Sequence, residues 1–383
     1  MTPHPVRRLA AVALAVCLSA CGPAATPGGP GRSVERVAGQ GATWARVPDI
    51  PLSPRTDPVL AWTGSEVLVV GGNTGSICPP YADCTTPTEL ASDGVALDPA
   101  TGTWRQVAPA PVGVWNSWGG GHDSVVVGDL LVVRGTRDTS WRGYDVVGDA
   151  WSTLSPPPGF EGRLVASGDR LWARSGSRIL SWDPVADAVR LEASYAPQRP
   201  LQDTQLFVTP AGPVLAGVRY GEAAPDEPTL TQVDVPDGAG GWRRFVTGQV
   251  GWLGHWDGRR LVGVEPGEVD GGEVNAWDRA YPFAGTLDPR TGDWQPLDVP
   301  RADLSYTGWR VSAAAGSRIV SLGHLLDTRT GAWVALDRPD SGLDHNLAAT
   351  WADQRLFVLG GVDQEAGFES PAAPEAWWWT PPA

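Results

Sequence analysis

Short apolar runs alternate with glycine-rich and polar turns along most of the chain, and their order repeats. A short first strand leads into a Gly-Asp or Gly-Ser turn, and a strongly apolar second strand such as Val67 to Val70 follows. A connection of variable length then precedes a third strand, a tight turn and a fourth strand. Short apolar runs between turn residues are typical of β-strands. The pattern therefore predicts a four-stranded unit that recurs along the chain.

The tight turn between the third and fourth strands marks the copies most clearly. In the first copy it reads L-D-P-A-T-G-T-W and ends at Trp104. We expect Asp98 to bond its own turn backbone and Gly102 to supply the left-handed conformation that closes the hairpin. Trp104 begins the fourth strand and is expected to pack between neighbouring units. The motif returns, more weakly in the last two cases, in residues 287–294, 326–333, 144–151 and 182–189.

The last copy ends at Thr380 and lacks a fourth strand. The residues from Thr43 to Pro48 (T-W-A-R-V-P) match those from Thr103 to Ala108 (T-W-R-Q-V-A) almost position for position. The amino-terminal strand is therefore expected to complete the last sheet and close a ring, which removes the exposed edges of a linear array. The expected fold class is all-β, a β-propeller of about seven four-stranded blades, with repeat lengths that allow six to eight. We expect each blade to bury one face against its neighbours.

Composition favours a turn-rich β protein over a disordered one. Among 383 residues, the 48 Gly and 36 Pro are interleaved with apolar runs, and many of the 20 Trp recur at repeat positions. The formal net charge is −14, and the mature region has no basic run. This argues against nucleic-acid binding, and equally against adhesion to an anionic membrane through charge. We expect a monomer whose acidity supports solubility.

The amino terminus has the features of an export signal. Arg7 and Arg8 form a basic region, an apolar segment follows, and Leu18-Ser19-Ala20-Cys21 resembles the bacterial lipobox, in which the cysteine is diacylated. An ordinary secretory signal with an incidental cysteine is the alternative, and the general secretory route is expected rather than the twin-arginine route. We expect a signal peptide in residues 1–20, a flexible tether in 21–42 and the propeller in 43–383. Lipidation at Cys21 would anchor the protein on the outer face of the bacterial cell membrane, its one expected membrane contact.

Two further cysteines remain in the mature chain outside the lipobox. Cys78 and Cys84 enclose a short segment, C-P-P-Y-A-D-C, which suits a loop-closing disulfide in an oxidising compartment. Such a short loop is expected to stabilise the fold by about 2 kcal/mol. A redox pair is disfavoured because the spacing is not C-x-x-C, and a metal site is disfavoured because no histidine lies nearby.

Several copies carry a second signature. Val70-Gly71-Gly72 and Leu359-Gly360-Gly361 each end an apolar run with a double glycine, and Tyr144 precedes Trp151 by the spacing of an aromatic–tryptophan pair. Leucines stand in the aromatic's place at Leu97, Leu287 and Leu326. Over residues 43–383 the chain therefore resembles the kelch-type propellers, the group to which galactose oxidase belongs. Galactose oxidase activity would need a copper site with Tyr and His ligands and a thioether bond between a Tyr and a Cys. Because we assign both cysteines to a disulfide, oxidase activity and a cofactor are not expected.

Ligands of propellers usually bind at the mouth of the central pore, where loops lead into the innermost strands. By this fold analogy we expect a ligand-binding mouth rich in aromatic and polar side chains. His122 stands out because it follows three glycines that would bring the backbone close to a ligand. The alternative for every member is simple packing of the pore rim. The candidate residues are Arg55, Trp115, Trp118, His122, Arg163, Asp203, Trp252, Tyr306 and His345.

Catalytic chemistry has no recognisable signature in this chain. The mature histidines show no H-x-H or H-x-x-x-H spacing, and no nucleophile elbow or P-loop is present, so neither catalytic nor metal-binding residues are assigned. The first hypothesis is a non-enzymatic module that binds a protein or cell-envelope partner through its loops, with long inserts at 74–90 and 265–281. The alternative is a carbohydrate-binding or carbohydrate-active protein using the aromatic mouth. A divalent-metal enzyme is a third, weaker hypothesis.

Overall fold

The structure is a computed structural model. It describes residues 41–75, 89–114, 123–134, 140–196, 201–219, 230–247, 254–264, 267–268, 280–281, 285–297, 311–321, 323–336, 339, 345–362 and 375–382. All four cysteines, the expected signal peptide and nearly all of the expected tether lie outside these residues. Lipidation at Cys21 and the Cys78–Cys84 disulfide therefore stay predictions. No helix in the described part of the chain has the length and apolar character needed to cross a lipid bilayer.

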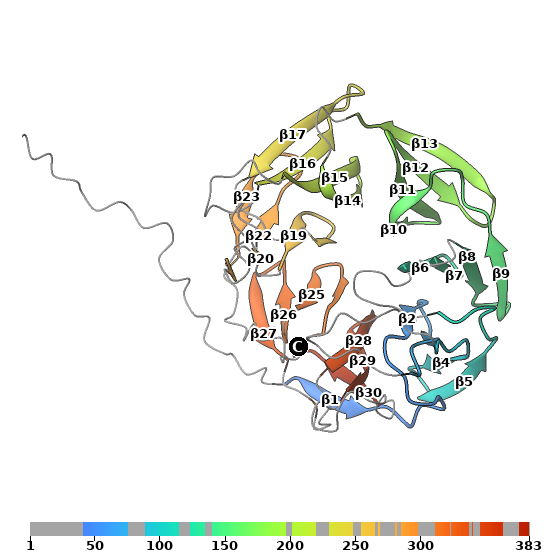
Figure 1. The fold of residues 1–383 in the computed structure, drawn as a ribbon. Helices are drawn as coiled ribbons and strands as arrows, with labels where there is room; N and C mark the ends of the chain where they lie inside the picture. Colours follow the sequence, from blue (N-terminus) through green and yellow to red (C-terminus); the bar gives the residue numbers. More distant parts are fainter. Residues whose placement is uncertain are drawn as a thin grey trace, which may run out of the picture.

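Seven four-stranded antiparallel sheets are arranged as blades around a centre, which confirms the predicted propeller (Figure 1). Blade 1 has β2 (Val59–Trp62), β3 (Val67–Val70), β4 (Gly94–Asp98) and β5 (Thr103–Val107), and blade 2 has β6 (Asp123–Val127), β7 (Leu130–Arg134), β8 (Trp141–Asp145) and β9 (Ala150–Leu154). Blade 3 has β10 (Glu161–Ser167), β11 (Arg170–Ser175), β12 (Arg178–Asp183) and β13 (Ala188–Ser194), and blade 4 has β14 (Gln202–Thr209), β15 (Gly212–Arg219), β16 (Leu230–Pro236) and β17 (Trp242–Thr247).

The second half of the ring continues the same order. Blade 5 has β18 (His255–Trp256), β19 (Leu261–Gly263), β22 (Gly285–Leu287) and β23 (Trp294–Pro296), and blade 6 has β24 (Ala313–Ala315), β25 (Arg318–Ser321), β26 (His324–Asp327) and β27 (Ala332–Ala335). Blade 7 has β28 (His345–Ala352), β29 (Arg355–Val362), β30 (Ala376–Thr380) and β1 (Thr43–Arg46). A separate two-stranded sheet, β20 (Gly267–Glu268) with β21 (Ala280–Tyr281), lies within the expected insert of blade 5.

The amino-terminal strand closes the ring as predicted. β1 pairs with β30, with Thr43 opposite Thr380 and Trp44 opposite Trp379, so the first and last strands meet in blade 7. The rings of Trp44 and Trp379 lie 6.4 Å apart. Gly41 and Pro382 are near neighbours just beyond the paired strands. The first and the last strand in sequence order therefore meet at one place on the rim, where the blue β1 borders the red β30 in Figure 1.

The repeated turn has the conformation that its residues predict. The Asp98 carboxylate accepts a hydrogen bond from the backbone N–H of Ala100 at 2.7 Å, and Gly102 has a φ of 70°. Where the weaker copies lack glycine, Asp149 and Asp187 occupy the same left-handed position with φ of 45° and 49°. Aspartate tolerates this region better than most residues because its short side chain bonds locally. The weaker copies therefore form the same turn with an aspartate in place of the glycine.

Blades are buried on both faces, so the expectation of a single buried face is wrong. On β3, Val67 and Val69 pack with residues of blade 7, whereas Leu68 and Val70 pack with residues of blade 2. All four side chains are fully buried. In a ring every blade has a neighbour on each side, so both faces of the middle strands lose contact with water. The alternation of polar and apolar positions typical of half-buried strands is absent there for this reason.

Tryptophans that begin fourth strands join neighbouring blades, as predicted for Trp104. The Trp104 indole N–H donates to the carbonyl of Pro48, which follows β1 of blade 7, at 3.1 Å. Trp151 donates in the same way to Ala108 of blade 1, and Trp242 donates to Ser194 of blade 3, both at 2.8 Å. Each bond links the start of one fourth strand to the end of the preceding one, and Figure 1 shows these outer strands following the rim.

Connections at the two ends of the inner strands differ in length. First and second strands are joined by tight turns, such as Gly128-Asp129, at an end that we call the turn face. The start of each first strand and the end of each second strand lie at the opposite end, which we call the loop face. Connections there vary in length, and the one between β3 and β4 spans residues 71–93. The antiparallel order therefore gathers the variable segments of every blade on one face of the ring.

Candidate functional site

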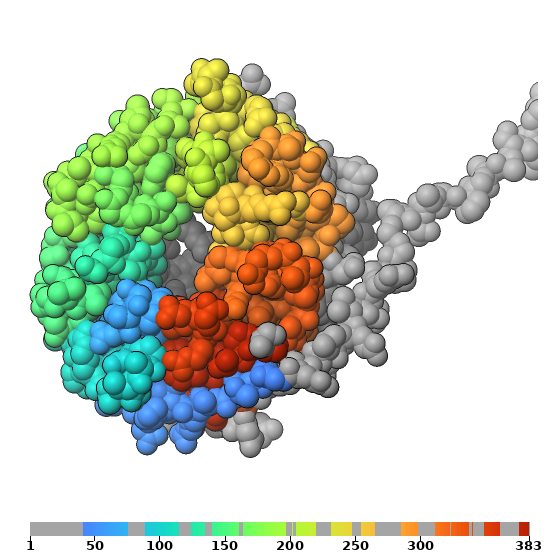
Figure 2. Space-filling view, turned by 180° about the vertical axis from the view of Figure 1, so that it is seen from behind, coloured from blue at the N-terminus to red at the C-terminus, as the bar shows by residue number. Residues whose placement is uncertain are grey.

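The first strand of each blade lies nearest the centre of the ring, around the hollow seen in Figure 2. Neighbouring first strands contact one another, as β2 does with β6 and with β28. The chain reaches each of these strands from the loop face, so the residues that precede them surround one mouth of the hollow. This is the place where the sequence predicts a ligand site.

The predicted site residues are only partly within the described chain. Arg55 is described in full. The backbones of Arg163, Asp203 and His345 lie in the loop-face halves of the first strands β10, β14 and β28, while their side chains lie outside the described residues. The remaining five also lie outside them: Trp115, Trp118, His122, Trp252 and Tyr306. A ligand site formed by these side chains stays a prediction.

Arg55 is held by partners within the protein. Only 1% of its side chain is exposed, and its guanidinium donates to the Asp93 carboxylate at 2.7 and 3.2 Å. It also donates to the carbonyl of Gly71 at 3.1 Å, and to the carbonyl and hydroxyl of Ser53 at 2.9 and 2.8 Å. The hydrogen bond from Arg55 holds the pKa of the Asp93 carboxyl below its usual range. A ligand would have to compete with Asp93 for this guanidinium.

The double glycine beside Arg55 lets two backbone segments meet. Gly71 and Gly72 have φ of 69° and 110°. The N–H of Gly72 donates to the carbonyl of Val114 at 2.7 Å, and a Cβ on Gly71 would lie 2.1 Å from that same oxygen. Val114 belongs to the segment that leads from blade 1 to blade 2. The motif that resembles kelch repeats thus has a packing role at the loop face.

Asp57 is a residue that the sequence interpretation missed. It lies two residues before β2 at the pore mouth, is partly buried and has a φ of 51°. Burial raises the pKa of its carboxyl to about 6. No motif marks it in the sequence, and its place before Pro58 predicts an extended backbone rather than the left-handed one that the structure has. A carboxyl with this pKa can gain or lose a proton near neutral pH, which is uncommon for an aspartate.

We predict that Asp57 makes folding stability depend on pH. Between about pH 4 and about pH 6 the folded protein holds a proton that the unfolded chain has released, so the contribution of Asp57 falls as pH rises through this window. Relative to Asp57→Asn, the free energy of unfolding of the wild type should decline by about 1 to 3 kcal/mol across it. Urea denaturation at a series of pH values measures this. Asparagine also tolerates the left-handed backbone, so the variant keeps the turn.

Asp98→Asn is the matched control for this prediction. The pKa of Asp98 is lowered by the backbone hydrogen bond from Ala100, so its contribution is lost as pH falls and has the opposite sign. Parallel stability curves for the wild type and Asp57→Asn would contradict the prediction.

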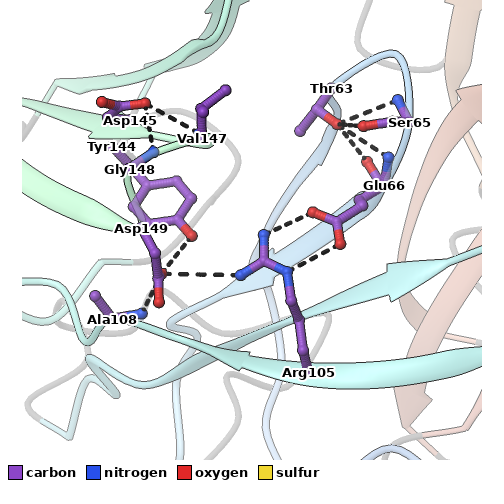
Figure 3. A network of polar contacts seen from close by, with 10 residues as sticks. All are labelled: Thr63, Ser65, Glu66, Arg105, Ala108, Tyr144, Asp145, Val147, Gly148 and Asp149. Atoms are coloured by element: carbon purple, nitrogen blue, oxygen red, sulfur yellow. Dashed lines mark hydrogen bonds and ion pairs between the residues drawn. The ribbon is translucent and has the colours of Figure 1, made fainter.

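A polar network crosses from blade 1 to blade 2 (Figure 3). Arg105 forms a bidentate pair with Glu66 at 2.9 and 2.6 Å and lies 3.9 Å from Asp149. Asp149 accepts hydrogen bonds from the Tyr144 hydroxyl at 2.7 Å and from the N–H of Ala108 at 2.8 Å. Burial and then the bond to Asp149 raise the pKa of Tyr144 to about 12, so this tyrosine is a neutral donor at physiological pH. The network joins the blades and offers no general base.

A second network joins blades 3 and 4. The Asp234 side chain is 1% exposed and accepts hydrogen bonds from Tyr195 at 2.6 Å, Gln232 at 2.7 Å and Arg244 at 3.1 Å. Burial and the bond to Asp234 raise the pKa of Tyr195. A buried carboxylate is tolerated when charged and polar donors surround it in this way. Asp234 is a buried acid, and its hydrogen bonds give it a structural role between blades 3 and 4.

The part of the chain that the structure describes holds no cluster of metal-binding side chains. No group of three or more His, Cys, Asp or Glu side chains is placed there to hold a metal ion. His255 bonds the carbonyl of Gly316 in blade 6 at 2.8 Å, and burial lowers its pKa. This histidine connects two blades.

Comparisons with known proteins add no family to these observations. No family model matches the chain, and no curated protein was found to resemble it. The fold, a closed seven-bladed β-propeller, is what the described residues establish.

Proposed function

We propose that this protein is an exported, lipid-anchored propeller of the kelch type that binds a protein or other cell-envelope partner at its loop face, without catalysis. The kelch assignment is supported by the positive φ of Gly71 and Gly72 and by the Tyr144–Trp151 ring pair, whose centroids are 5.2 Å apart. The anchor is supported by the lipobox-like sequence that ends at Cys21.

The difference between the two faces carries the proposal. At the turn face the connections are short and alike. At the loop face, the connections between second and third strands vary from two residues, Gly176-Ser177 in blade 3, to long stretches such as 71–93 in blade 1 and 264–284 in blade 5. Conserving a scaffold while varying its loops is how propellers and other repeat folds form recognition surfaces. The first hypothesis of a loop-based binding module is therefore favoured.

The described polar clusters support a binding role over an enzymatic one. The Arg55, Tyr144 and Asp234 networks each consist of groups that satisfy one another and join segments of the scaffold. A catalytic side chain, by contrast, needs a hydrogen-bonding position that is open toward the substrate. Within the described residues Asp57 is the group whose pKa departs toward neutrality, and alone it supplies no nucleophile or acid–base partner.

Photo-crosslinking in cells tests this proposal. A photoreactive residue replaces Glu89 or Pro111, both exposed at the loop face, or Ser65 or Gln354, exposed in tight turns of the turn face. We expect one envelope partner to crosslink to the full chain from the loop-face positions and not from the turn-face positions. Equal crosslinking from both faces would argue against it. Binding of the purified chain to a glycan array, with no protein crosslink, would favour the carbohydrate alternative.

Cys21→Ser is the companion variant in the same experiment, with Cys17→Ser in the apolar signal segment as its control. Loss of the acyl chains should release the Cys21→Ser protein from the membrane fraction, while the control stays bound. A Cys21→Ser chain that remains membrane-bound would refute the lipid anchor but leave the loop-face result intact.

A further inference from the structure

One tryptophan is missing from an otherwise regular position of the ring. Near the start of the fourth strand, six of the seven described blades carry a tryptophan that packs toward the preceding blade. In blade 3 the corresponding residue, opposite Trp182 on the third strand, is Val189. The six tryptophans are buried or half-buried, whereas Val189 is 47% exposed. They are Trp44, Trp104, Trp151, Trp242, Trp294 and Trp333.

Val189 lies on the face of blade 3 that packs against blade 2. Side chains opposite one another in an antiparallel pair share a face of the sheet, and Trp182 lies 5.9 Å from the ring of Trp141 in blade 2. Leu191 is on the same face, because alternate residues of a strand share a side. β13 follows β9 along the rim in Figure 1. We call the line where they meet the 2–3 seam, with Leu154 on β9 and Val189 and Leu191 on β13 as its apolar members.

Trp182 does not replace the missing tryptophan. Its indole N–H donates to Asp187 in the turn of its own blade at 3.1 Å, just as the hydroxyl of Tyr144 donates to Asp149 in blade 2 at 2.7 Å. Trp182 therefore corresponds to Tyr144, and blade 2 carries Trp151 in addition, with its ring 5.2 Å from that of the tyrosine. An aromatic residue on the third strand thus coexists with a tryptophan on the fourth, and blade 3 lacks the second of the two.

The 2–3 seam keeps the backbone carbonyl that an indole would use. At three other seams the indole N–H donates to a carbonyl at the end of the preceding fourth strand, namely that of Pro48, Ala108 or Ser194. Pro48 and Ala108 each lie four residues after the tryptophan of their own blade. The same spacing from Trp151 gives Ser155, which is exposed just beyond β9. The side chain of Val189 has no N–H to donate to this carbonyl.

Exposed apolar side chains collect at this seam. Of the five large hydrophobic residues that are exposed in the described chain, three belong to β13 or to the turn before it: Val185 at 82%, Val189 at 47% and Leu191 at 59%. The residue that corresponds to Leu191 is Thr153 in blade 2 and Gln106 in blade 1. Val189 and Leu191 together extend about 7 Å along the strand. Solvent exposure of these two side chains is unfavourable, and a partner that covers them would gain binding energy.

We propose that the 2–3 seam binds a tryptophan side chain of a partner protein, in the position that the chain's own tryptophans occupy at the other six seams. The indole ring covers Val189 and donates its N–H to the carbonyl of Ser155. Leu191 is then covered by a second apolar residue of the partner, which is why a polypeptide segment fits this surface better than a free indole compound. Aromatic anchors at the centre of an apolar patch are typical of protein interfaces. The seam belongs to the outer strands, and the inference does not depend on the loop-face partner of the proposed function.

Titration of the full chain with a short peptide that contains fluorotryptophan and leucine tests the proposal, with fluorine NMR as the readout. The wild type should shift and broaden the fluorine signal in a saturable way. Val189→Trp fills the seam from within the chain, so it should weaken peptide binding by about tenfold or more and raise the Tm by about 1 to 4 °C. Val246→Trp is the matched control, because Val246 is a fourth-strand valine with 45% exposure in a blade that keeps Trp242. The control should change neither value.

Leu191→Thr gives a second test that adds no ring, because it introduces the residue that blade 2 has at this position; peptide binding should weaken by about fivefold. A peptide whose indole nitrogen is methylated should also bind about fivefold more weakly, since it has no N–H for Ser155. Absence of saturable binding to the wild type, or equal binding to the wild type and Val189→Trp, overturns the proposal. Dimerisation of the wild type that Val189→Trp abolishes in analytical ultracentrifugation also overturns it, because the occupant is then a second copy of this chain.

Discussion

Replacing Gly71 with alanine is expected to lower the free energy of unfolding by about 2 to 5 kcal/mol. Two effects combine at this position. The φ of 69° is unfavourable for a residue with a Cβ, and the added atom would lie 2.1 Å from the carbonyl oxygen of Val114. Because Gly72 also bonds that carbonyl, relief would require the blade 1–blade 2 connection to move. Urea denaturation monitored by tryptophan fluorescence measures the loss.

Gly102→Ala is the matched control for this substitution. Its φ of 70° equals that of Gly71 within a degree, but a Cβ on Gly102 meets no atom within 4 Å. The control therefore isolates the cost of the left-handed backbone, about 1 to 2 kcal/mol. If Gly71→Ala and Gly102→Ala destabilise the protein equally, the close approach of Val114 has no energetic weight and the packing role of the double glycine is wrong.

Replacing Asp234 with alanine is expected to cost about 3 to 5 kcal/mol of folding free energy. The variant leaves the buried hydroxyl of Tyr195 and the amide of Gln232 without their acceptor, and it leaves Arg244 without its ion-pair partner. Unpaired buried polar groups are costly because the protein interior cannot replace the hydrogen bonds that water would provide. Thermal and urea unfolding of the variant give the size of the effect.

Asp237→Ala serves as the control for Asp234→Ala. Asp237 accepts hydrogen bonds from the N–H groups of Ala239 and Gly241 in an exposed turn, where water can replace it, so its loss should cost much less than the loss of Asp234. A Tyr195→Phe substitution should also cost less in the Asp234→Ala background than in the wild type, since the two residues share one bond. Equal costs for Asp234→Ala and Asp237→Ala would show that the blade 3–blade 4 network contributes little.

The architecture could be predicted because its signals are local. A turn that places Asp98 and Gly102 in one hairpin depends only on residues that are adjacent in the chain, and the structure confirms it. Ring closure was also predictable, because Trp44 stands in a copy of a fourth strand that the last repeat lacks. Repetition supplied the blade count: each copy is a weak signal, but copies in the same order reinforce one another.

The side-chain partners could not be predicted in the same way. Arg55 was expected to face a ligand, but the structure places it with Asp93, which is 38 residues away and belongs to another segment of the same blade. Asp57 and Asp234 have no motif around them, and their environments come from burial against separate segments. The single buried face expected for each blade was wrong because the neighbour on the second side is known only when the ring is assembled.

Sequence alone therefore determined the β-strand repeat, its tight turns and the closure by β1, since these depend on backbone conformation and on spacing along the chain. Tertiary structure decided which polar groups satisfy one another, which carboxyl has a raised pKa, and that both faces of a blade are buried. Those properties depend on distance and burial in three dimensions, which arise only when remote segments pack together. For this propeller, the clearest case is Asp234, which accepts hydrogen bonds from Tyr195, Gln232 and Arg244 although no motif surrounds it in the sequence.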